Sequence, residues 1–291
     1  MVHDAPDPDS IRPLIDAALA EDIGLGDATT NATVPRGARV RAEVRAKESG
    51  VVCGIPVMKA VFGRVEPDLV FGAEASDGDR VTPGQVVARL EGPARGVLTG
   101  ERVALNFLQH LSGIATATAH SVAVLEGTGT ALLDTRKTIP GLRLLAKYAV
   151  RCGGGTNHRR GLDDMVLIKE NHILAAGGIT AAVGRARERY PDLAVEVEVT
   201  DREELREALE SRPDRIMLDN FQPAEVATAV ASVTSWAAER KEPRPEIELS
   251  GGITGENLAA YGAAGADYIS SGAVTHSVRA LDFSLEVTER L

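Results

Sequence analysis

The sequence has few aromatic residues, few cysteines and a deficit of positive charge. Only 3% of its 291 residues are aromatic, which argues against a platform for stacking nucleic-acid bases. The formal net charge of −10 argues against general polyanion binding, because that depends on broad basic surfaces. Two cysteines, Cys53 and Cys152, are too few for a disulfide framework and indicate a reducing cytoplasm. These deficits predict a cytoplasmic protein that does not bind nucleic acid.

Long apolar runs are also missing. No run approaches the roughly 20 residues that a membrane span requires. The first 13 residues have neither the basic end nor the apolar segment of a signal peptide. A hydrophobic fraction of 44% with 25% charged residues is typical of a soluble globular protein. The sequence therefore predicts no membrane partner.

Positive charge is concentrated in one segment, residues 136–172, although the whole chain is acidic. The segment has three acidic residues and eight basic ones: Arg136, Lys137, Arg143, Lys147, Arg151, Arg159, Arg160 and Lys169. The spacing of Arg143, Lys147 and Arg151 is helical and fits a solvated basic face. Arg136–Lys137 and His158–Arg159 fall in strand-end or loop positions, so we expect them to bind a ligand. Cys152 has no accompanying pair of base and orienting group, which argues against a nucleophilic role.

The first region of the chain, up to about residue 115, mixes helices, strands and turns. Ser10 is expected to N-cap a helix that runs to Glu21. Segments 39–46 and 86–92 have strand character, and a helical pattern starts at Thr99, with an interruption near Gly113. This region predicts a separate α/β domain.

The second region alternates apolar strands with helical patterns, which indicates βαβ units and a parallel sheet. Six strand candidates lie at 130–134, 165–169, 194–199, 215–219, 246–250 and 267–271. They fit either an open doubly wound sheet or a β/α barrel. Polar residues follow every one of these strands, whereas an open sheet would concentrate them near a single switch point. We therefore favour a barrel.

Two carboxylates in this region suit a magnesium ion. Glu196 and Glu198 share one face of their strand, opposite the valines, and we expect both to point into the barrel. Glu198 and Asp219 end consecutive strands, so they should lie side by side and offer the oxygen ligands that Mg²⁺ prefers. The alternative is that the glutamates only neutralise Lys169 or an arginine.

Glycine-containing turns follow the last two strands. Residues 250–254 and 270–276 each precede a possible helix, and backbone N–H groups at such positions bind phosphate. Arginine forks and lysine ammonium groups supply further anion contacts. Together with the carboxylates, these features predict a site for a small, highly anionic substrate with Mg²⁺.

The sequence resembles the quinolinate phosphoribosyltransferase family over nearly its whole length. The resemblance is carried by 21-EDIGLGDATT-30, 100-GERVALNFLQHLSGIAT-116, 134-DTRKTIPGLR-143, 153-GGGTNHRRGLDDMVLIKENH-172, 194-AVEVEV-199, 216-IMLDN-220 and 249-LSGGIT-254. It implies an α/β fold with an N-terminal sandwich domain at 1–115, a seven-stranded β/α barrel at 116–275 and a tail at 276–291 that returns to the first domain. It also implies a homodimer that converts quinolinate and phosphoribosyl pyrophosphate to nicotinate mononucleotide, CO₂ and pyrophosphate.

The resemblance further implies roles for particular residues. The residues that would bind quinolinate are Arg136, His158, Arg159 and Lys169, with Arg102 entering from a partner subunit. Lys137, Glu198 and Asp219 would serve the pyrophosphate, the ribose and Mg²⁺, and Ser250, Gly251, Gly272 and His276 the 5′-phosphate. Lys137, Lys169, Glu198 and Asp219 are the expected catalytic residues.

Three other functions remain open at this stage. A nicotinate phosphoribosyltransferase would use the same co-substrate without decarboxylation. A barrel aldolase would use Lys169 as a Schiff base, which leaves the neighbouring cations and carboxylates unexplained. Residues 77–92 resemble a hairpin of biotinyl or lipoyl carriers, but the nearby Lys59 lies in a helical pattern rather than a tight turn.

Overall fold

The computed structural model describes residues 5–291, and the chain divides into two compact units. The first unit contains the chain up to Ala119 together with Thr138–Gly154 and Val274–Leu291. The second contains His120–Lys137 and Gly155–Ala273. Residues 1–4, the start of the expected first domain, lie outside the described residues. The chain thus leaves the second unit after Lys137 and returns to it at Gly155.

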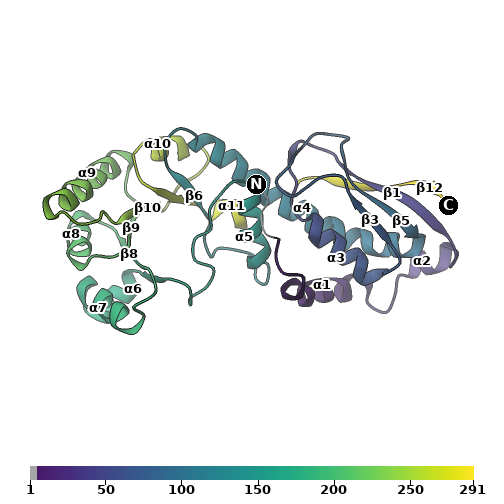
Figure 1. Ribbon diagram of the computed structural model, residues 1–291, viewed down its shortest axis with the longest axis horizontal. Helices are drawn as coiled ribbons and strands as arrows, with labels where there is room; N and C mark the ends of the chain where they lie inside the picture. Colours follow the sequence, from purple (N-terminus) through teal and green to yellow (C-terminus); the bar gives the residue numbers. More distant parts are fainter. Residues whose placement is uncertain (1–4) are drawn as a thin grey trace. The chain divides into compact units, whose positions relative to one another are not determined.

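The first unit is built on a four-stranded antiparallel sheet in the order β12-β1-β5-β3 (Figure 1). The strands are β1 (Arg39–Ala46), β3 (Val70–Ala73), β5 (Val86–Pro93) and β12 (Phe283–Arg290). A short antiparallel pair joins β2 (Gly50–Val51) and β4 (Arg80–Val81). Because β12 comes from the end of the chain and pairs with β1, the C-terminal tail completes this unit.

Helices α1, α3 and α4 lie beside this sheet (Figure 1). The unit contains α1 (Pro8–Ile23), α2 (Ala28–Thr33), α3 (Ile55–Val65), most of α4 (Ala94–Leu125) and α5 (Arg143–Cys152). Lys59 lies within α3, as expected from its helical pattern.

Two details of these helices correct the sequence-based expectations. The N-cap of α1 is Asp7 rather than Ser10, since the Asp7 carboxylate accepts the N–H of Asp9 at 3.1 Å. Helix α4 continues through Gly113 without interruption. A Cβ atom at Gly113 would lie 2.4 Å from the carbonyl oxygen of Arg279, so this glycine permits close packing of the backbone rather than breaking the helix.

The second unit is a six-stranded parallel sheet in the order β6-β11-β10-β9-β8-β7. Its strands are β6 (Ala131–Leu133), β7 (Val166–Ile168), β8 (Val195–Val199), β9 (Arg215–Asp219), β10 (Glu246–Ser250) and β11 (Tyr268–Ser270). Each strand candidate from the sequence is therefore confirmed. In place of a seventh strand, residues 5–291 show a single parallel bridge between Leu133 and Thr156, on the open side of β6.

Helices follow these strands along the chain, as Figure 1 shows. They are α6 (Glu170–Ala176), α7 (Ile179–Arg189), α8 (Arg202–Ser211), α9 (Pro223–Arg240), α10 (Leu258–Gly262) and α11 (Ala273–His276), which ends in the first unit. Val195, Val197 and Val199 are fully buried. Among the residues described, no helix combines the length and the apolar character needed to cross a bilayer.

Candidate functional site

The ends of the parallel strands form a cavity of about 170 Å³ within the second unit. We call it the cationic cavity. It is lined by Thr135, Arg136, Lys137, His158, Arg159, Leu167, Lys169, Met217, Glu248, Ser250 and Ser270. Six of the residues predicted for the substrate site meet there, because parallel strands bring their carboxyl ends to one edge of the sheet.

Arg136 and Arg159 are close enough to affect each other electrostatically. Burial lowers the pKa of Arg159, and the positive charge of Arg136 lowers it further. Arg159 Nη1 donates to the carbonyl oxygen of Met165 at 3.2 Å, which fixes its guanidinium. Two like charges held close together favour binding of an anion, because the anion offsets their mutual repulsion.

Asp134, at the end of β6, holds the loop that carries His158. Its side chain is fully buried and accepts the His158 N–H at 2.8 Å and the Asn157 side-chain amide at 2.6 Å. The sequence reasoning missed this role. The available signal was an aspartate directly after an apolar strand and before Thr135-Arg136-Lys137.

The interior of the sheet contains a buried ionic cluster around His158. The Nε2 atom of His158 lies 3.0 Å from Glu196 Oε2 and 3.4 Å from Glu248 Oε2. Arg215 Nη1 donates to Glu248 Oε2 at 3.2 Å. The Glu196 side chain is therefore buried, which agrees with the prediction that it points into the barrel. Its partner there is a histidine, which it neutralises.

Protonation within this cluster follows from burial and from the opposite charges. Burial disfavours the imidazolium, but Glu196 and Glu248 outweigh it and raise the pKa of His158 to about 9. Burial raises the pKa of Glu196 to about 7, although His158 opposes the shift. Burial also opposes ionisation of Glu248, yet His158 holds the pKa of that carboxyl below its usual value. His158 is thus positively charged at neutral pH.

Glu198 and Asp219 lie on the adjacent strands β8 and β9, as predicted. Glu198 forms an ion pair with Lys169, so the alternative that a glutamate neutralises this lysine is confirmed for that contact. Asp219 Oδ2 accepts the side-chain amide of Asn220 at 2.6 Å. Neither carboxylate is among the residues that line the cationic cavity.

The first glycine turn is shaped by a close approach between strands. Ser250 lines the cavity, and its carbonyl accepts the N–H of Asn220 at 2.9 Å. Gly251 has φ of +88°, and a Cβ atom there would lie 2.2 Å from Asn220 Oδ1. Only glycine fits this position. In the second turn, Gly272 separates β11 from α11, and His276 is exposed with its Nδ1 2.6 Å from Ser277 Oγ.

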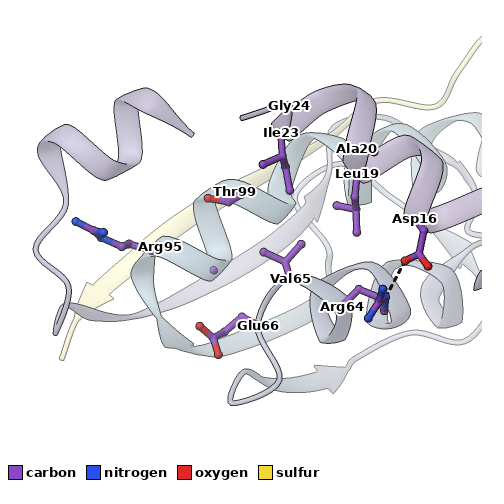
Figure 2. Close-up of a pocket in the computed structure, with 11 residues that line it drawn as sticks. Asp16, Leu19, Ala20, Ile23, Gly24, Arg64, Val65, Glu66, Arg95 and Thr99 are labelled. Atoms are coloured by element: carbon purple, nitrogen blue, oxygen red, sulfur yellow. Dashed lines mark hydrogen bonds and ion pairs between the residues drawn. The ribbon is translucent and has the colours of Figure 1, made fainter. Parts of the chain in front are cut away.

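A larger cavity of about 690 Å³ lies within the first unit (Figure 2). Its two arginines already have partners in the chain. Arg64 pairs with Asp16 at 2.8 Å, and Arg95 donates to the Val34 carbonyl at 2.6 and 2.9 Å. Its lining has two cationic side chains, whereas the lining of the cationic cavity has four and a histidine, so we assign the substrate site to the smaller cavity.

Two other cationic positions belong to the first unit. Arg102 lies on α4 with 58% of its side chain exposed and comes within 3.9 Å of Glu101. Lys147 was expected on a solvated basic face, but only 3% of it is exposed. That expectation is wrong because α5 buries nearly its whole length, including Leu145, Ala149 and Val150.

A parallel α/β sheet with cations, carboxylates and glycine turns at its strand ends defines a class of proteins that bind small anionic ligands. Similarity to known proteins identifies the family within this class. The family model "Quinolinate phosphoribosyl transferase, C-terminal domain" matches residues 114–286, and the corresponding N-terminal domain matches residues 27–112. The chain belongs to the quinolinate phosphoribosyl transferase family.

Individual relatives agree with this assignment. A carboxylating nicotinate-nucleotide pyrophosphorylase from Mycobacterium leprae is 43% identical, over 96% of this chain and 98% of the relative. A probable enzyme of the same name from Bacillus subtilis is 42% identical, over 96% and 93%. The solved nicotinate-nucleotide pyrophosphorylase of Francisella tularensis superposes with a TM-score of 0.92 at 39% identity, covering 99% of each chain.

A more distant likeness concerns one of the alternative functions. Human nicotinic acid phosphoribosyltransferase superposes with a TM-score of 0.62, but at 12% identity it shows a shared fold alone. The carboxylating nicotinate-nucleotide pyrophosphorylases are similar at more than three times that identity and over nearly the full chain.

Proposed function

We propose that the protein transfers the phosphoribosyl group of phosphoribosyl pyrophosphate to quinolinate, with loss of CO₂. The products are nicotinate mononucleotide, CO₂ and pyrophosphate. The observation that supports this most strongly is the grouping of Arg136, Arg159 and Lys169 around one cavity, in a chain that matches the decarboxylating family over its length. Three cations suit a dicarboxylate better than a monocarboxylate.

The quinolinate carboxylates are proposed to bind Arg136, His158, Arg159 and Lys169. Charge-assisted hydrogen bonds to carboxylate oxygens are about twice as strong as neutral ones, and arginine can bind both oxygens at once. The raised pKa of His158 supports its part, because an imidazolium adds a further positive charge. Lys169 would exchange its pairing with Glu198 for contact with the substrate.

Phosphoribosyl pyrophosphate is proposed to bind beside quinolinate. Its pyrophosphate and ribose would contact Lys137, Glu198 and Asp219, and its 5′-phosphate would contact Ser250, Gly251, Gly272 and His276. The positive φ of Gly251 supports a phosphate turn, since such backbone presents N–H groups toward anions.

The chemical step needs no base to create the nucleophile, because the pyridine nitrogen already has a lone pair. The nitrogen attacks the ribose C1 as the C1–O bond to pyrophosphate breaks, and alignment of the two substrates lowers the barrier. Cationic side chains stabilise the departing pyrophosphate. The bond between the ring carbon and the carboxylate next to the nitrogen then breaks and CO₂ departs. The electron pair stays on that carbon, stabilised by the adjacent pyridinium nitrogen, and the carbon takes up a proton from solvent.

A magnesium ion is proposed at Glu198 and Asp219. Their donor chemistry fits, because Mg²⁺ takes carboxylate oxygens and usually retains several waters. The two clusters of metal-ligating side chains found among the described residues do not include either carboxylate. Waters and pyrophosphate oxygens would therefore complete the coordination, and the ion would neutralise charge on the leaving group.

We further propose a cytoplasmic homodimer whose active site is shared between subunits. The exposure of the Arg102 side chain supports a contact with another molecule. In a two-fold dimer, each chain would supply Arg102 to the quinolinate site of its partner.

The acceptor specificity provides the test of the proposed function. The purified chain is incubated with phosphoribosyl pyrophosphate and Mg²⁺, with either quinolinate or nicotinate as acceptor. We expect the mononucleotide from quinolinate only. Product from nicotinate alone would instead support the non-decarboxylating transferase, and borohydride trapping of a keto-sugar on Lys169 would support the aldolase.

A further inference from the structure

The only two cysteines of the chain meet within the first unit, beside an aspartate. Cys53 precedes α3, Asp77 lies in the turn before β4, and Cys152 ends α5. The two sulfur atoms and a carboxylate oxygen of Asp77 all lie within 4.8 Å of one another. Both cysteines are buried and Asp77 is partly buried. Three separate segments of the chain thus bring three metal-ligating groups together, in the unit that does not contain the cationic cavity.

Hydrogen bonds fix the orientation of the Asp77 carboxylate. Its Oδ1 accepts the Ile55 N–H at 2.9 Å, and its Oδ2 accepts the Gly54 N–H at 2.9 Å and the Tyr148 hydroxyl at 2.8 Å. Such outer partners orient a ligating carboxylate in known metal sites. The contacts also cap the start of α3, which gives Asp77 a structural role whether or not an ion binds.

The backbone at both cysteines is also held by contacts with α4. Ser112 on α4 accepts the backbone N–H of Cys53 at 2.9 Å and donates to its carbonyl at 3.1 Å. Next to Cys152, a Cβ atom at Gly153 would lie 2.4 Å from the carbonyl oxygen of Ala115, so α4 also packs closely there. The cluster is therefore preorganised by its surroundings.

The capping role alone does not account for two thiols placed at the same carboxylate. A bound cation would account for the grouping of all three side chains, because thiolate sulfur and carboxylate oxygen are both ligands for divalent metals.

We propose that Cys53, Asp77 and Cys152 form a binding site for a thiophilic divalent cation of the zinc type. Two sulfur ligands and one carboxylate suit zinc, whereas Mg²⁺ prefers oxygen ligands alone. Sulfurs bound tetrahedrally at about 2.3 Å from zinc lie roughly 3.8 Å apart, so the observed spacing needs a shift of about 1 Å at most. Binding releases the two thiol protons to solvent and leaves a fourth position for water.

An ion at this site would link the start of α3 to the end of α5. It would stabilise the first unit because it binds the folded chain and finds no assembled site in the unfolded one. The site does not depend on the proposed phosphoribosyl transfer, so either can fail without the other.

Cobalt spectroscopy gives a direct test, since a thiolate-to-Co²⁺ charge-transfer band can come only from these two cysteines. The chain, without an affinity tag, is reduced with a phosphine, stripped with a chelator and titrated with Co²⁺. We expect the band to saturate at one Co²⁺ per chain, to disappear on addition of Zn²⁺, and to survive a large excess of Mg²⁺. Absence of the band, with both thiols still titratable after unfolding, would overturn the proposal.

Variants and a protection measurement complete the test. Cys53→Ser and Cys152→Ser should each lose at least half of the band, and Asp77→Asn should weaken Co²⁺ binding at least tenfold. Asp79→Asn, a change in the same turn at a carboxylate outside the cluster, should bind as the parent does. In the unmodified chain, one equivalent of Zn²⁺ should slow alkylation of both thiols at least tenfold. Unchanged alkylation would contradict the site even if a variant fails to fold.

Discussion

The imidazole Nε2 of His158 lies 3.0 Å from Oε2 of Glu196 in the interior of the parallel sheet. Both side chains are buried, and Glu248 approaches the same nitrogen atom. A buried cation paired with carboxylates is costly to disturb, because removal of one partner leaves an uncompensated charge. This cluster therefore holds a positive charge at the wall of the cationic cavity.

The pairing predicts a specific pH dependence. The pKa of His158 is higher in the folded state than in the unfolded state, so protonation of this histidine stabilises the fold. The stabilisation is complete below the ordinary histidine value of about 6.5 and is lost as pH rises through about 9. Glu196 is largely ionised only above its own pKa of about 7. Glu196→Gln should therefore weaken quinolinate binding most strongly between pH 7 and 9, where the ionised carboxylate keeps His158 charged. Because the folded-state pKa values of both groups are raised, the parent loses stability as pH rises, and the variant should lose less.

Quinolinate affinity and urea unfolding at several pH values would check this prediction. Glu239→Gln removes the same charge from an exposed position on α9 and serves as the control. An equal effect of Glu196→Gln at pH 6 and pH 8.5 would contradict the assigned charge state of His158.

The arginines of the cationic cavity should control quinolinate more than its co-substrate. Arg136→Ala or Arg159→Ala should weaken quinolinate binding by about 2–3 kcal/mol, because each removes a charge-assisted hydrogen bond to a carboxylate. Calorimetric titration with each substrate measures the difference. Arg160→Ala is the matched control, since its side chain is 66% exposed and outside the cavity lining. Equal losses for both substrates, or for neither, would reject the assignment.

The two proposed metal carboxylates should show their role through magnesium dependence. Glu198→Gln and Asp219→Asn should each reduce turnover, and excess Mg²⁺ should partly restore it, because the remaining ligands bind the ion more weakly. Asp219→Asn is the cleaner of the two, since Glu198 also pairs with Lys169. Full activity of both variants at limiting Mg²⁺ would show that these carboxylates have a structural role and do not bind the ion.

Asp27 should stabilise the first unit as the N-cap of α2. It accepts the Thr30 N–H at 2.9 Å and the Thr99 hydroxyl at 3.0 Å, and the bonds from Thr30 lower its pKa. Asp27→Ala should cost about 1 kcal/mol of unfolding free energy at neutral pH. Since the folded pKa is depressed, this stabilisation is present above the ordinary aspartate pKa and lost as pH falls through the folded value. Denaturant unfolding tests this, with the exposed Asp68→Ala as control; no pH dependence of the difference would contradict it.

Subunit exchange tests the shared active site. Arg102→Ala and Lys137→Ala should each be nearly inactive alone and regain activity when mixed. In a mixed dimer, one site has intact Lys137 and receives intact Arg102, while the other carries both defects. With random exchange half of the dimers are mixed, so roughly a quarter of the sites should work. No recovery, with exchange shown independently, would place Arg102 in the site of its own chain.

The strands and their polar ends could be predicted from the sequence because both signals are local. The apolar run 215–219, for example, is β9, with Asp219 at its end. The continuity of helix α4 was harder to predict, since a glycine such as Gly113 often interrupts a helix. Its role in close packing depends on the backbone at Arg279, which is distant in the sequence.

Long-range contacts account for what the sequence did not reveal. Asp134 becomes informative only when the loop at His158 folds onto it. Cys53 and Cys152 are likewise far apart in the sequence, and tertiary packing is what places them at Asp77. Lys147 has helical spacing, but no local pattern indicates that α5 is buried.

The central claim is that phosphoribosyl transfer to quinolinate and loss of CO₂ occur together on this chain. The most direct measurement uses quinolinate labelled in the carboxylate next to the ring nitrogen, and follows labelled CO₂, pyrophosphate and mononucleotide in one reaction. We predict release of labelled CO₂ only when phosphoribosyl pyrophosphate is present, in a one-to-one ratio with the mononucleotide and with pyrophosphate. Mononucleotide that retains the label, or labelled CO₂ released without the co-substrate, would contradict the account.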